Sequence, residues 1–386
     1  MGLSLREISF LNLRNYPSFG IDGIGDLTII VGRNAVGKTN IIEGIQLVTS
    51  LSSLRGATAG QLIAWGEKSL MVSVKEEDEA RSLEVVLKIS EGKREYRLNG
   101  KPKRPKDIRG LLPSVVFTPD DLTLIKGAQS IKRNTLDALG EQVHANYHTV
   151  KKDYDKLIRY KNLLLKEDPN PALLQSVNDL LVITGTQLQG YRRALLRKMA
   201  PHIQEIYEGI TEGKEDLACS YVPFWESYDE ERPYFLNFRK EESQLHYSRE
   251  LEKRAKEEKA RKLSTVGPHA DKIDFFIDGK NAGIYASQGQ QRSLVLAYKL
   301  AEVATIEEMT RCRPILLLDD VMSELDSQRR KALLNRLSGQ TFITTTTLDY
   351  FPEQTIEHAK IVRLPLPYGE GGQRLSPVES KGTQKP

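Results

Sequence analysis

The residues with the clearest chemical potential are Gly32 to Thr39, whose glycine, lysine and threonine spacing is that of a phosphate-binding loop. In such a loop, backbone N–H groups face phosphate oxygens, the lysine reaches the β and γ phosphates, and the threonine can bind Mg²⁺. The candidate nucleotide-binding residues are Gly32, Arg33, Asn34, Ala35, Val36, Gly37, Lys38, Thr39 and Asn40, with Lys38 also catalytic and Thr39 also a metal ligand. A purely structural glycine-rich turn is the alternative. It is disfavoured because a buried strand is expected before the loop and a helix after it.

A nucleotide site of this kind also needs a carboxylate at the end of another buried strand, where it can hold the metal ion. Residues 315–318 form a continuous apolar run, and Asp319 and Asp320 follow it directly. We assign Asp319 to the metal and Asp320 to the role of catalytic base or water-orienting group. The alternative is that the two aspartates only cap the helix expected after them. Together the two motifs predict a P-loop NTPase.

The elements that must position these motifs can be read from hydrophobic periodicity. Buried strands are expected at 27–31 and 315–318, a further strand at 341–347, and a half-exposed strand at 5–13. Helices are expected at about 40–51, 249–262, 289–309 and 327–337. Two or three strands are expected in 68–100, with a hairpin pair at 72–89 and a turn at Asn99-Gly100. The predicted fold class is therefore α/β, a P-loop head with a mixed sheet and flanking helices.

The middle of the chain is different in kind and predicts an inserted helical lobe. Apolar residues recur at steps of three and four from Leu136 to Leu164 and from Leu173 to Ile206, which indicates two amphipathic helices of about thirty residues. The DPNP sequence at 168–171 separates them, so we expect an antiparallel pair. The predicted domains are 1–122 (first half of the head, with a hairpin and basic loop at 68–109), 123–254 (helical lobe), 255–365 (second half of the head) and 366–386 (disordered tail).

A further motif, Ser287-Gln288-Gly289-Gln290, precedes the helix expected at 289–309 and resembles the signature sequence of ABC-type ATPases. Residues 323–326 (SELD) resemble the D-loop of the same family. In that family the signature serine and glycine contact the γ-phosphate held by the opposite subunit, so ATP joins two heads. The resemblance therefore implies an ABC-type head in which Ser287, Gly289 and Gln290 bind nucleotide. An ordinary N-capped helix is the alternative for SQGQ taken alone.

Blocks distributed over nearly the whole chain are similar to the RecF family of bacterial recombination mediators. They are LNLRNY (11–16), GRNAVGKTNIIEGI (32–45), SLRGATAGQLIAWG (53–66), VVFTPDDLTLIKGAQSIKRNTLD (115–137), GPHAD (267–271), SQGQQRSLVLAYKLAE (287–302), LLLDDVMSELD (316–326) and FITTTT (342–347). The resemblance implies an ATP-dependent homodimer that needs ATP and Mg²⁺, hydrolyses ATP slowly with stimulation by DNA, and binds DNA at single-strand gaps or junctions. It also implies RecA loading together with RecO and RecR, and roles in DNA repair, replication, recombination and the SOS response.

Three positions depart from the usual pattern of the RecF family. Ala35 stands where the loop usually has glycine, so it needs either a backbone without positive φ or some strain. Ala270 and Lys272 replace an arginine and an aspartate, which puts charge pairing at 270–272 in question. A threonine among residues 344–347 stands where transporter ATPases carry a switch histidine.

Positive charge is concentrated in one segment. The chain of 386 residues has a net charge of only +4, whereas residues 93–109 contain eight basic and two acidic residues, a net charge of +6. We predict that this segment binds DNA phosphates independently of sequence. The candidate contacts are Lys93, Arg94, Arg97, Lys101, Lys103, Arg104, Lys106 and Arg109. A solvated loop is the alternative. A second basic group, Arg192, Arg193, Arg197 and Lys198, is better explained as a solvated helix face.

Several other classes of site and function are disfavoured. Cys219 and Cys312 are far apart, which excludes a disulfide framework or a cysteine zinc site and favours a reducing cytoplasm. No apolar run approaches the ~20 residues of a membrane helix. His144 and His148 are four residues apart but have no evident third ligand, so no metal site is expected. Two other functions stay open: a P-loop phosphotransferase acting on a small molecule, and the ATPase subunit of a DNA defence or nuclease system.

Overall fold

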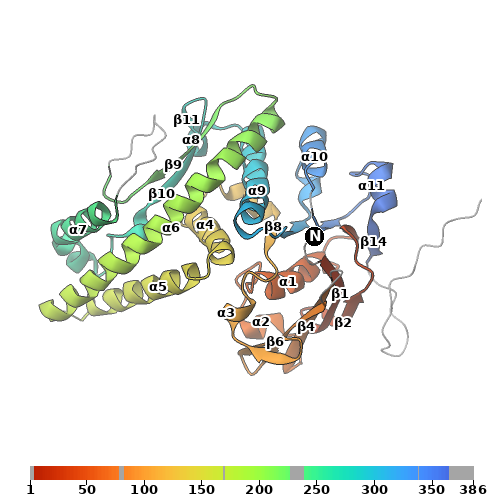
Figure 1. Ribbon diagram of the computed structural model, residues 1–386, viewed down its shortest axis with the longest axis horizontal. Coiled ribbons are helices and arrows are strands. Elements are labelled where there is room, and N and C mark those ends of the chain that lie inside the picture. Colours follow the sequence, from red (N-terminus) through yellow and green to blue (C-terminus); the bar gives the residue numbers. More distant parts are fainter. Residues whose placement is uncertain (1–3, 78–81, 168–169, 227–238, 338, 365–386) are drawn as a thin grey trace, which may run out of the picture. The chain divides into compact units, whose positions relative to one another are not determined.

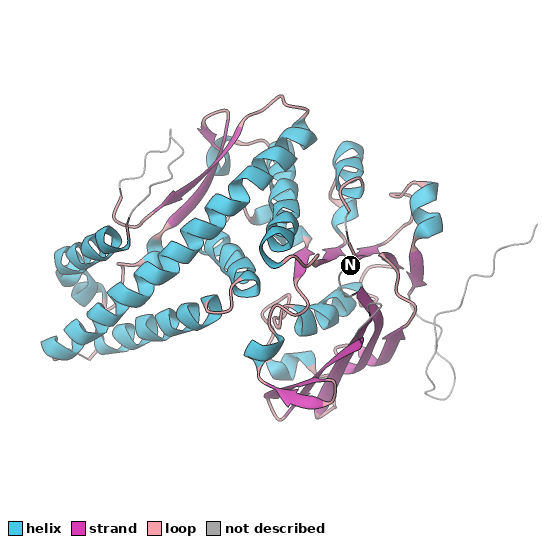
Figure 2. Ribbon diagram, in the orientation of Figure 1, coloured by secondary structure: helices cyan, strands magenta, loops and turns pink. Residues whose placement is uncertain are grey.

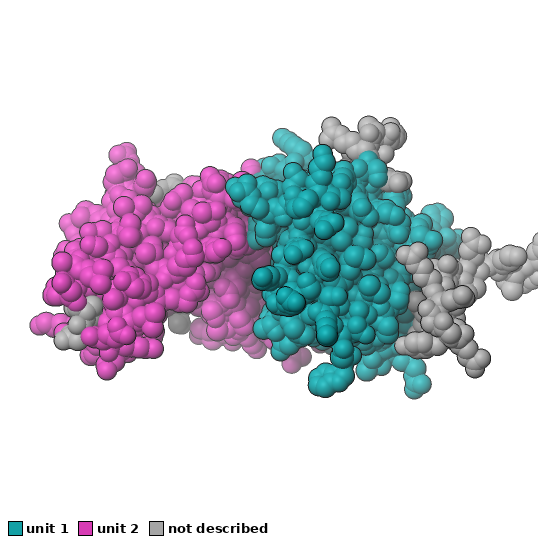
Figure 3. Space-filling view, turned by 90° about the horizontal axis from the view of Figure 1, so that it is seen from below, with its two compact units in different colours: residues 1–119, 306–386 teal, residues 120–305 magenta. Residues whose placement is uncertain are grey.

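The computed structural model describes residues 4–77, 82–167, 170–226, 239–337 and 339–364. The chain forms two compact units, unit 1 with residues 1–119 and 306–386 and unit 2 with residues 120–305 (Figure 3). The first boundary lies close to the predicted one at 122. The second differs, because residues 255–305, which we assigned to the head, pack within unit 2. One reason is that β10 (Lys272–Ile277) pairs there with β9 (Leu217–Val222).

The nucleotide motifs of unit 1 lie on a parallel sheet of five strands, in the order β14-β3-β13-β12-β8. Figure 1 labels its two edge strands, β14 and β8. The strands are β3 (Leu27–Val31), β8 (Ser114–Phe117), β12 (Ile315–Asp319), β13 (Thr341–Thr345) and β14 (Lys360–Arg363). Every residue of β12 and β13 is buried, as expected for strands covered on both faces. The strands predicted at 27–31, 315–318 and 341–347 are confirmed as β3, β12 and β13, whereas β8 and β14 were not predicted.

A second, antiparallel sheet in unit 1 has six strands in the order β2-β1-β4-β5-β6-β7. They are β1 (Ser4–Leu13), β2 (Tyr16–Ile21), β4 (Ser69–Glu77), β5 (Ser82–Ser90), β6 (Lys93–Leu98) and β7 (Lys101–Lys103). Asn99 (φ 49°) and Gly100 (φ 73°) form the predicted tight turn between β6 and β7. The pairing of β4 with β5 is confirmed, and its turn at 78–81 lies outside the described residues.

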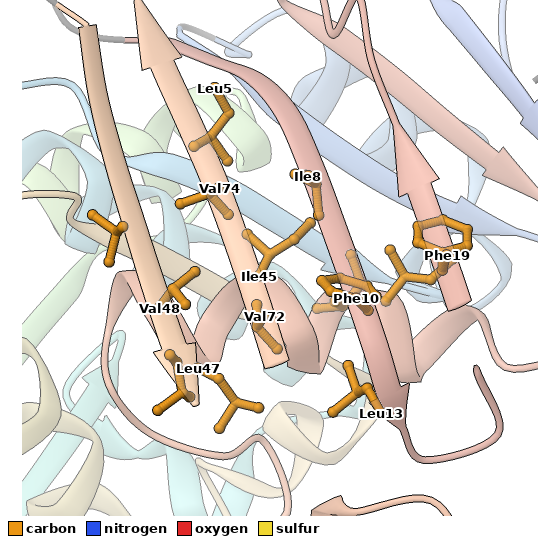
Figure 4. Packing of buried hydrophobic residues seen from close by; sticks show 14 of the residues in the cluster. Leu5, Ile8, Phe10, Leu13, Phe19, Ile45, Leu47, Val48, Val72 and Val74 are labelled. Carbon is orange, nitrogen blue, oxygen red and sulfur yellow. The ribbon is translucent and has the colours of Figure 1, made fainter. Parts of the chain in front are cut away.

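Helix α1 (Lys38–Thr49) packs between the two sheets of unit 1. Figure 4 shows apolar side chains of the antiparallel sheet, such as Phe10 and Val72, around Ile45 of α1. The same buried cluster includes Leu317 and Phe342 from the parallel sheet. Both sheets therefore fix the N-terminus of α1, where the loop lysine and threonine lie. The other helices of unit 1 are α2 (Ala59–Leu62), α3 (Pro105–Ile108), α10 (Ser327–Leu334) and α11 (Glu353–His358).

Unit 2 is mainly helical, as Figure 2 shows. Its described residues include one small sheet in the order β11-β10-β9. Its remaining elements are α4 (Gln129–Val143), α5 (Tyr147–Leu164), α6 (Pro171–Thr211), α7 (Lys240–Arg261), α8 (Ala282–Tyr285), α9 (Gln288–Thr310, whose end belongs to unit 1) and β11 (Lys280–Asn281). The first long helix was predicted wrongly as continuous, because an extended backbone at His144 (φ −138°, ψ 116°) separates α4 from α5. The antiparallel pairing is confirmed for α5 and α6, which pack together across a short connection.

Within the described part of the chain, no helix combines the length and apolarity needed to cross a membrane. The predicted tail at 366–386 lies outside the described residues. Cys219 and Cys312 are both free thiols, and Cys219 is buried. His144 lies against the ring of Tyr191 at a centroid distance of 4.6 Å, and His148 bonds to Glu141 at 2.9 Å. The histidine pair thus has local packing and hydrogen-bonding partners, and no metal-binding group of three His, Cys, Asp or Glu occurs among the described residues.

Candidate nucleotide-binding site

The phosphate-binding loop occupies residues 32–37, between the end of β3 and the first residue of α1. Ala35 has φ 64° and Gly37 has φ 109°, so both lie in the left-handed region. Ala35 therefore has the strained backbone with positive φ, and not the alternative of a backbone without positive φ. Glycine would adopt this conformation without the Cβ contact that strains alanine.

Ala35→Gly is expected to stabilise the protein by about 0.5–1 kcal/mol. Relief of the left-handed strain, roughly 1–2 kcal/mol, exceeds the entropic cost of glycine, roughly 0.5–1 kcal/mol. Urea unfolding of the whole protein, monitored by circular dichroism, measures the change in the free energy of unfolding. A glycine variant at least 0.5 kcal/mol less stable than wild type would show that Ala35 is not strained.

Lys38 is held against the loop that precedes it. Its ammonium group donates to the carbonyl oxygens of Gly32 at 2.9 Å and Arg33 at 3.2 Å, and the residue is only 6% exposed. An ammonium group has three hydrogens, so these two bonds leave one for a phosphate oxygen. The geometry fits the predicted role of this lysine.

Thr39, at the N-terminus of α1, is connected to Asp319 and Thr344, which lie at the carboxyl ends of β12 and β13. The Asp319 carboxylate accepts a hydrogen bond from Thr39 Oγ1 at 2.8 Å and another from Thr344 Oγ1 at 2.7 Å. Because β13 lies between β3 and β12, the ends of these strands bring side chains 280 residues apart into contact. Among the threonines 344–347, Thr344 is the one that contacts the acid pair, a detail that residue spacing did not reveal.

Asp320 adopts a left-handed conformation (φ 53°), and its N–H donates to Thr344 Oγ1 at 2.9 Å. Burial raises the pKa of its carboxyl; the negative charge of Asp319 raises it further, and Lys38 lowers it. The buried Oδ1 has no hydrogen-bond partner among the described residues, so it can accept one from a water molecule. The helix-cap alternative for the acid pair is wrong, because Asp326 caps α10 by accepting from the Arg329 N–H at 2.9 Å.

The donor set of this site fits Mg²⁺, which prefers oxygen ligands and keeps several waters. The Thr39 hydroxyl and the Asp319 carboxylate lie next to one another and could both bind the ion. Two protein ligands are enough for Mg²⁺ when phosphate oxygens and water complete its coordination. The described residues are therefore consistent with a metal site that forms together with a nucleotide.

The signature residues lie in unit 2, at the start of α9. The Gln290 N–H donates to Ser287 Oγ at 3.2 Å, and the Ser287 N–H donates to Gln290 Oε1 at 2.8 Å, which is a capping box. The capped-helix explanation therefore holds for the local geometry. It does not exclude a nucleotide contact, since Ser287 is exposed and the cap uses only an acceptor position of its hydroxyl.

The basic segment forms the outer edge of the antiparallel sheet, on β6, β7 and α3. Seven of the eight predicted cations are exposed, and Arg109 is partly buried. Lys101 and Lys103 of β7 lie opposite Leu98 and Tyr96 of β6, so these four side chains share one face of the sheet. Because side chains alternate along a strand, Lys93 and Arg97 of β6 lie on the other face. Lysines on an edge strand also prevent pairing with other strands, which is a structural alternative to DNA binding.

The second basic group does not form a single solvated face, because Arg192 is buried (3% exposed). Its guanidinium donates to both carboxylate oxygens of Asp137 at 2.7 Å and to the Pro268 carbonyl at 2.7 Å. Solvation was therefore the wrong explanation for this residue. Sequence reasoning missed it because Asp137 lies 55 residues away on another helix.

The GPHAD block contributes to the same interior of unit 2. Asp271 is fully buried and accepts hydrogen bonds from the Phe224 N–H at 2.8 Å, from Gln189 and from the Tyr221 hydroxyl. Lys272 is exposed. Asp271 is thus satisfied by neutral donors, and the departures at 270 and 272 leave its hydrogen bonds in place.

Comparison with known proteins agrees with this geometry. The model of the RecF/RecN/SMC N-terminal domain matches residues 4–363. The chain is 33% identical to the DNA replication and repair protein RecF of Heliobacterium modesticaldum, over 94% of this chain and 97% of that one, and 34% identical to RecF of Lactococcus lactis subsp. cremoris, over 90% and 94%.

Solved structures similar to this chain include RecF and an Smc head domain. The recombination mediator protein RecF-ATPrS in the RecFOR pathway matches with a TM-score of 0.83 and 28% identity, over 91% of this chain and 94% of that one. A Pyrococcus furiosus Smc head domain matches with a TM-score of 0.52 and 14% identity over 94% and 93%, which supports the fold alone. The fold is that of an ABC-type ATPase head, and the chain belongs to the RecF/RecN/SMC family and, within it, to the RecF proteins.

Proposed function

We propose that the protein is an ATP-dependent DNA-binding protein that dimerises on ATP and hydrolyses it slowly, with stimulation by DNA. The observation that carries the proposal is the connected set of Lys38, Thr39, Asp319, Thr344 and Asp320 at the carboxyl edge of one parallel sheet. Relatives of similar length and fold are described as RecF bound to ATP and ATPrS, which supports ATP as the nucleotide.

In this proposal the residues of the site have distinct tasks. Lys38 would contact the β and γ phosphates. Thr39 and Asp319 would hold Mg²⁺, which would neutralise part of the phosphate charge. Thr344 orients Asp319 and fixes the backbone of Asp320. Asp320 accepts a proton from the attacking water or aligns that water, because Thr344 fixes its backbone N–H and its Oδ1 has no hydrogen-bond partner in the described part of the chain.

Dimerisation follows from the signature residues. We infer that Ser287, Gly289 and Gln290 of one copy contact the γ-phosphate bound to residues 32–39 of the other copy. The N-terminus of α9, with its positive dipole end and the exposed Ser287, suits a phosphate. ATP then joins two copies, and hydrolysis lets them separate.

Ser287→Arg is expected to abolish ATP-dependent dimerisation while each monomer still binds ATP, because the bulky side chain would stand where the phosphate of the opposite copy belongs. Sedimentation velocity with and without ATP measures the dimer, and Ser248→Arg, a substitution in α7 of unit 2, serves as the control. Dimerisation of the Ser287 variant at wild-type ATP concentrations would contradict the contact between copies.

The DNA ligand is proposed from the relatives, which are named as DNA replication and repair proteins and placed in the RecFOR pathway. We propose that the protein acts in the cytoplasm, in keeping with its two free cysteines, and binds gapped or junction DNA. There it would work with RecO and RecR to promote RecA loading. The exposed cations of residues 93–109 are the proposed DNA contacts.

Replacing Lys101, Lys103 and Arg104 together by alanine is expected to weaken DNA binding and to reduce the slope of log K against log salt by up to about 2.7, since each neutralised phosphate contributes about 0.9. Fluorescence anisotropy at several salt concentrations gives the slope. Lys253, Lys256 and Lys262 of unit 2 provide a triple-alanine control of equal charge. An unchanged slope in the first variant would place the DNA surface elsewhere.

Two rival functions receive less support. A small-molecule phosphotransferase would not need the signature and D-loop motifs, and a nuclease-associated ATPase would not explain similarity to RecF over more than nine-tenths of the chain. ATP turnover that depends on a small acceptor and ignores DNA would favour the first rival. DNA cleavage in the presence of Mn²⁺ would favour the second.

A further inference from the structure

The turn between β1 and β2 lies directly against the phosphate-binding loop, although its residues are not part of that loop. Asn15 donates from Nδ2 to the carbonyl oxygen of Val36 at 3.2 Å. Its Oδ1 accepts from Asn40 Nδ2, in the first turn of α1, at 2.7 Å. One carboxamide therefore connects the end of the loop to the start of the helix, on either side of Lys38 and Thr39.

The approach of the turn to the loop is close enough to restrict the residue at position 37. A Cβ placed on Gly37 would lie 2.6 Å from Asn15 Nδ2 and 2.9 Å from the Tyr16 hydroxyl. Gly37 also has φ 109°, a conformation that suits glycine. The loop and the turn thus fit together without space between them, so a movement of one requires a movement of the other.

The turn itself is anchored to the same helix at a second point. Arg14 forms two hydrogen bonds with the buried Glu43 of α1, at 2.9 and 3.2 Å, and donates to the Gln61 carbonyl at 2.8 Å. Ser53 also donates to Glu43, at 2.6 Å. Arg14 therefore fixes the turn to the second turn of α1, and Asn15 extends from this fixed base to the loop.

We propose that Asn15 is a positioning residue for nucleotide binding. Its bridge to Val36 and Asn40 holds the loop in the conformation that presents Lys38 and Thr39 to phosphate. This inference rests on the proposed function, because it assumes that residues 32–39 bind ATP. It assigns to the turn a role that acts through the loop, without direct contact between Asn15 and the reacting atoms.

Asn15→Ala is expected to raise the Kd and KM for ATP about five- to tenfold, the effect of losing two exposed hydrogen bonds, and to leave kcat within about twofold. Asn12→Ala is a matched control in the same hairpin. It also removes two hydrogen bonds of a side-chain amide, to Glu67 at 3.2 Å and to the Ser69 carbonyl at 3.3 Å, but none to the loop. Asn12 has φ 55°, so its replacement should cost at least as much stability.

Three measurements test the role of Asn15. Titration with a fluorescent ATP analogue gives the Kd, steady-state hydrolysis gives KM and kcat, and thermal unfolding without nucleotide gives the stability. The inference predicts weaker ATP binding by the Asn15 variant alone, at an unfolding temperature no lower than that of the Asn12 variant. ATP binding within twofold of wild type in the Asn15 variant, or equal weakening in both variants, would overturn it. If the wild-type protein itself fails to bind the analogue, the proposed function fails, and the inference falls with it.

Discussion

Asp320→Asn is expected to slow ATP hydrolysis by about 10²- to 10⁴-fold while changing ATP affinity by no more than about threefold. The range is that of general acid–base catalysis by one positioned side chain. Asparagine has nearly the same shape and keeps the backbone bonds to Thr344, but it cannot accept a proton. Single-turnover hydrolysis, together with equilibrium ATP binding, separates the two effects.

The pH dependence gives an independent test of the same residue. Because burial raises the pKa of the Asp320 carboxyl in the nucleotide-free protein, kcat/KM for ATP, which reports the groups of the free enzyme, should fall on the acid side with a midpoint above the ordinary aspartate value of about 3.9. Only the deprotonated form can act as a base, so activity is present above this pKa and lost as the pH falls through it. The variant should lack this acid limb. Asp22→Asn, at an exposed acid of unit 1, is the control. An Asp320→Asn rate within threefold of wild type would exclude the proposed role.

Arg192→Ala is expected to destabilise unit 2 by about 3–5 kcal/mol. Removing one partner of a buried ion pair is costly, and here the Asp137 carboxylate, in a residue that is 3% exposed, would lose both guanidinium hydrogen bonds. Its remaining cationic neighbour, Lys151, lies farther away, at 3.9 Å. The Tyr147 hydroxyl also donates to Asp137 at 2.7 Å, so the loss would reach the contact between α4 and α5. Urea unfolding followed by circular dichroism measures the change.

The same helix provides a matched control for this prediction. Lys198 is an exposed cation of α6, and Lys198→Ala should change stability by no more than about 0.5 kcal/mol. A loss below about 1 kcal/mol in the Arg192 variant would mean that the pair is hydrated or that Asp137 becomes protonated at little cost. Either result would contradict the packing described for unit 2.

The sequence was most informative where the signal is local. The phosphate-binding loop is a fixed spacing within eight residues, and β3 and β12 are continuous apolar runs, because strands covered on both faces have no polar side. Each signal is contained in a few neighbouring residues. The nucleotide motifs and the buried strands that bear them could therefore be predicted without any knowledge of tertiary contacts.

Other features depend on partners far away in the chain. Thr344 is distinguished from the neighbouring threonines by its hydrogen bond to Asp319 on the adjacent strand. Arg192 is buried because it pairs with Asp137 on a different helix. The break between α4 and α5 at His144 has no proline to mark it. Short strands such as β8 and β14 are specified by their neighbours in the sheet more than by their own four residues.

The most direct test of the account is DNA binding measured with ATP, with ADP and without nucleotide, on gapped, single-stranded and duplex DNA at two salt concentrations. The account predicts tight, salt-sensitive binding with ATP, with preference for the gapped substrate, and much weaker binding with ADP or no nucleotide. Equal affinity in all three nucleotide states would contradict the claim that ATP controls DNA binding.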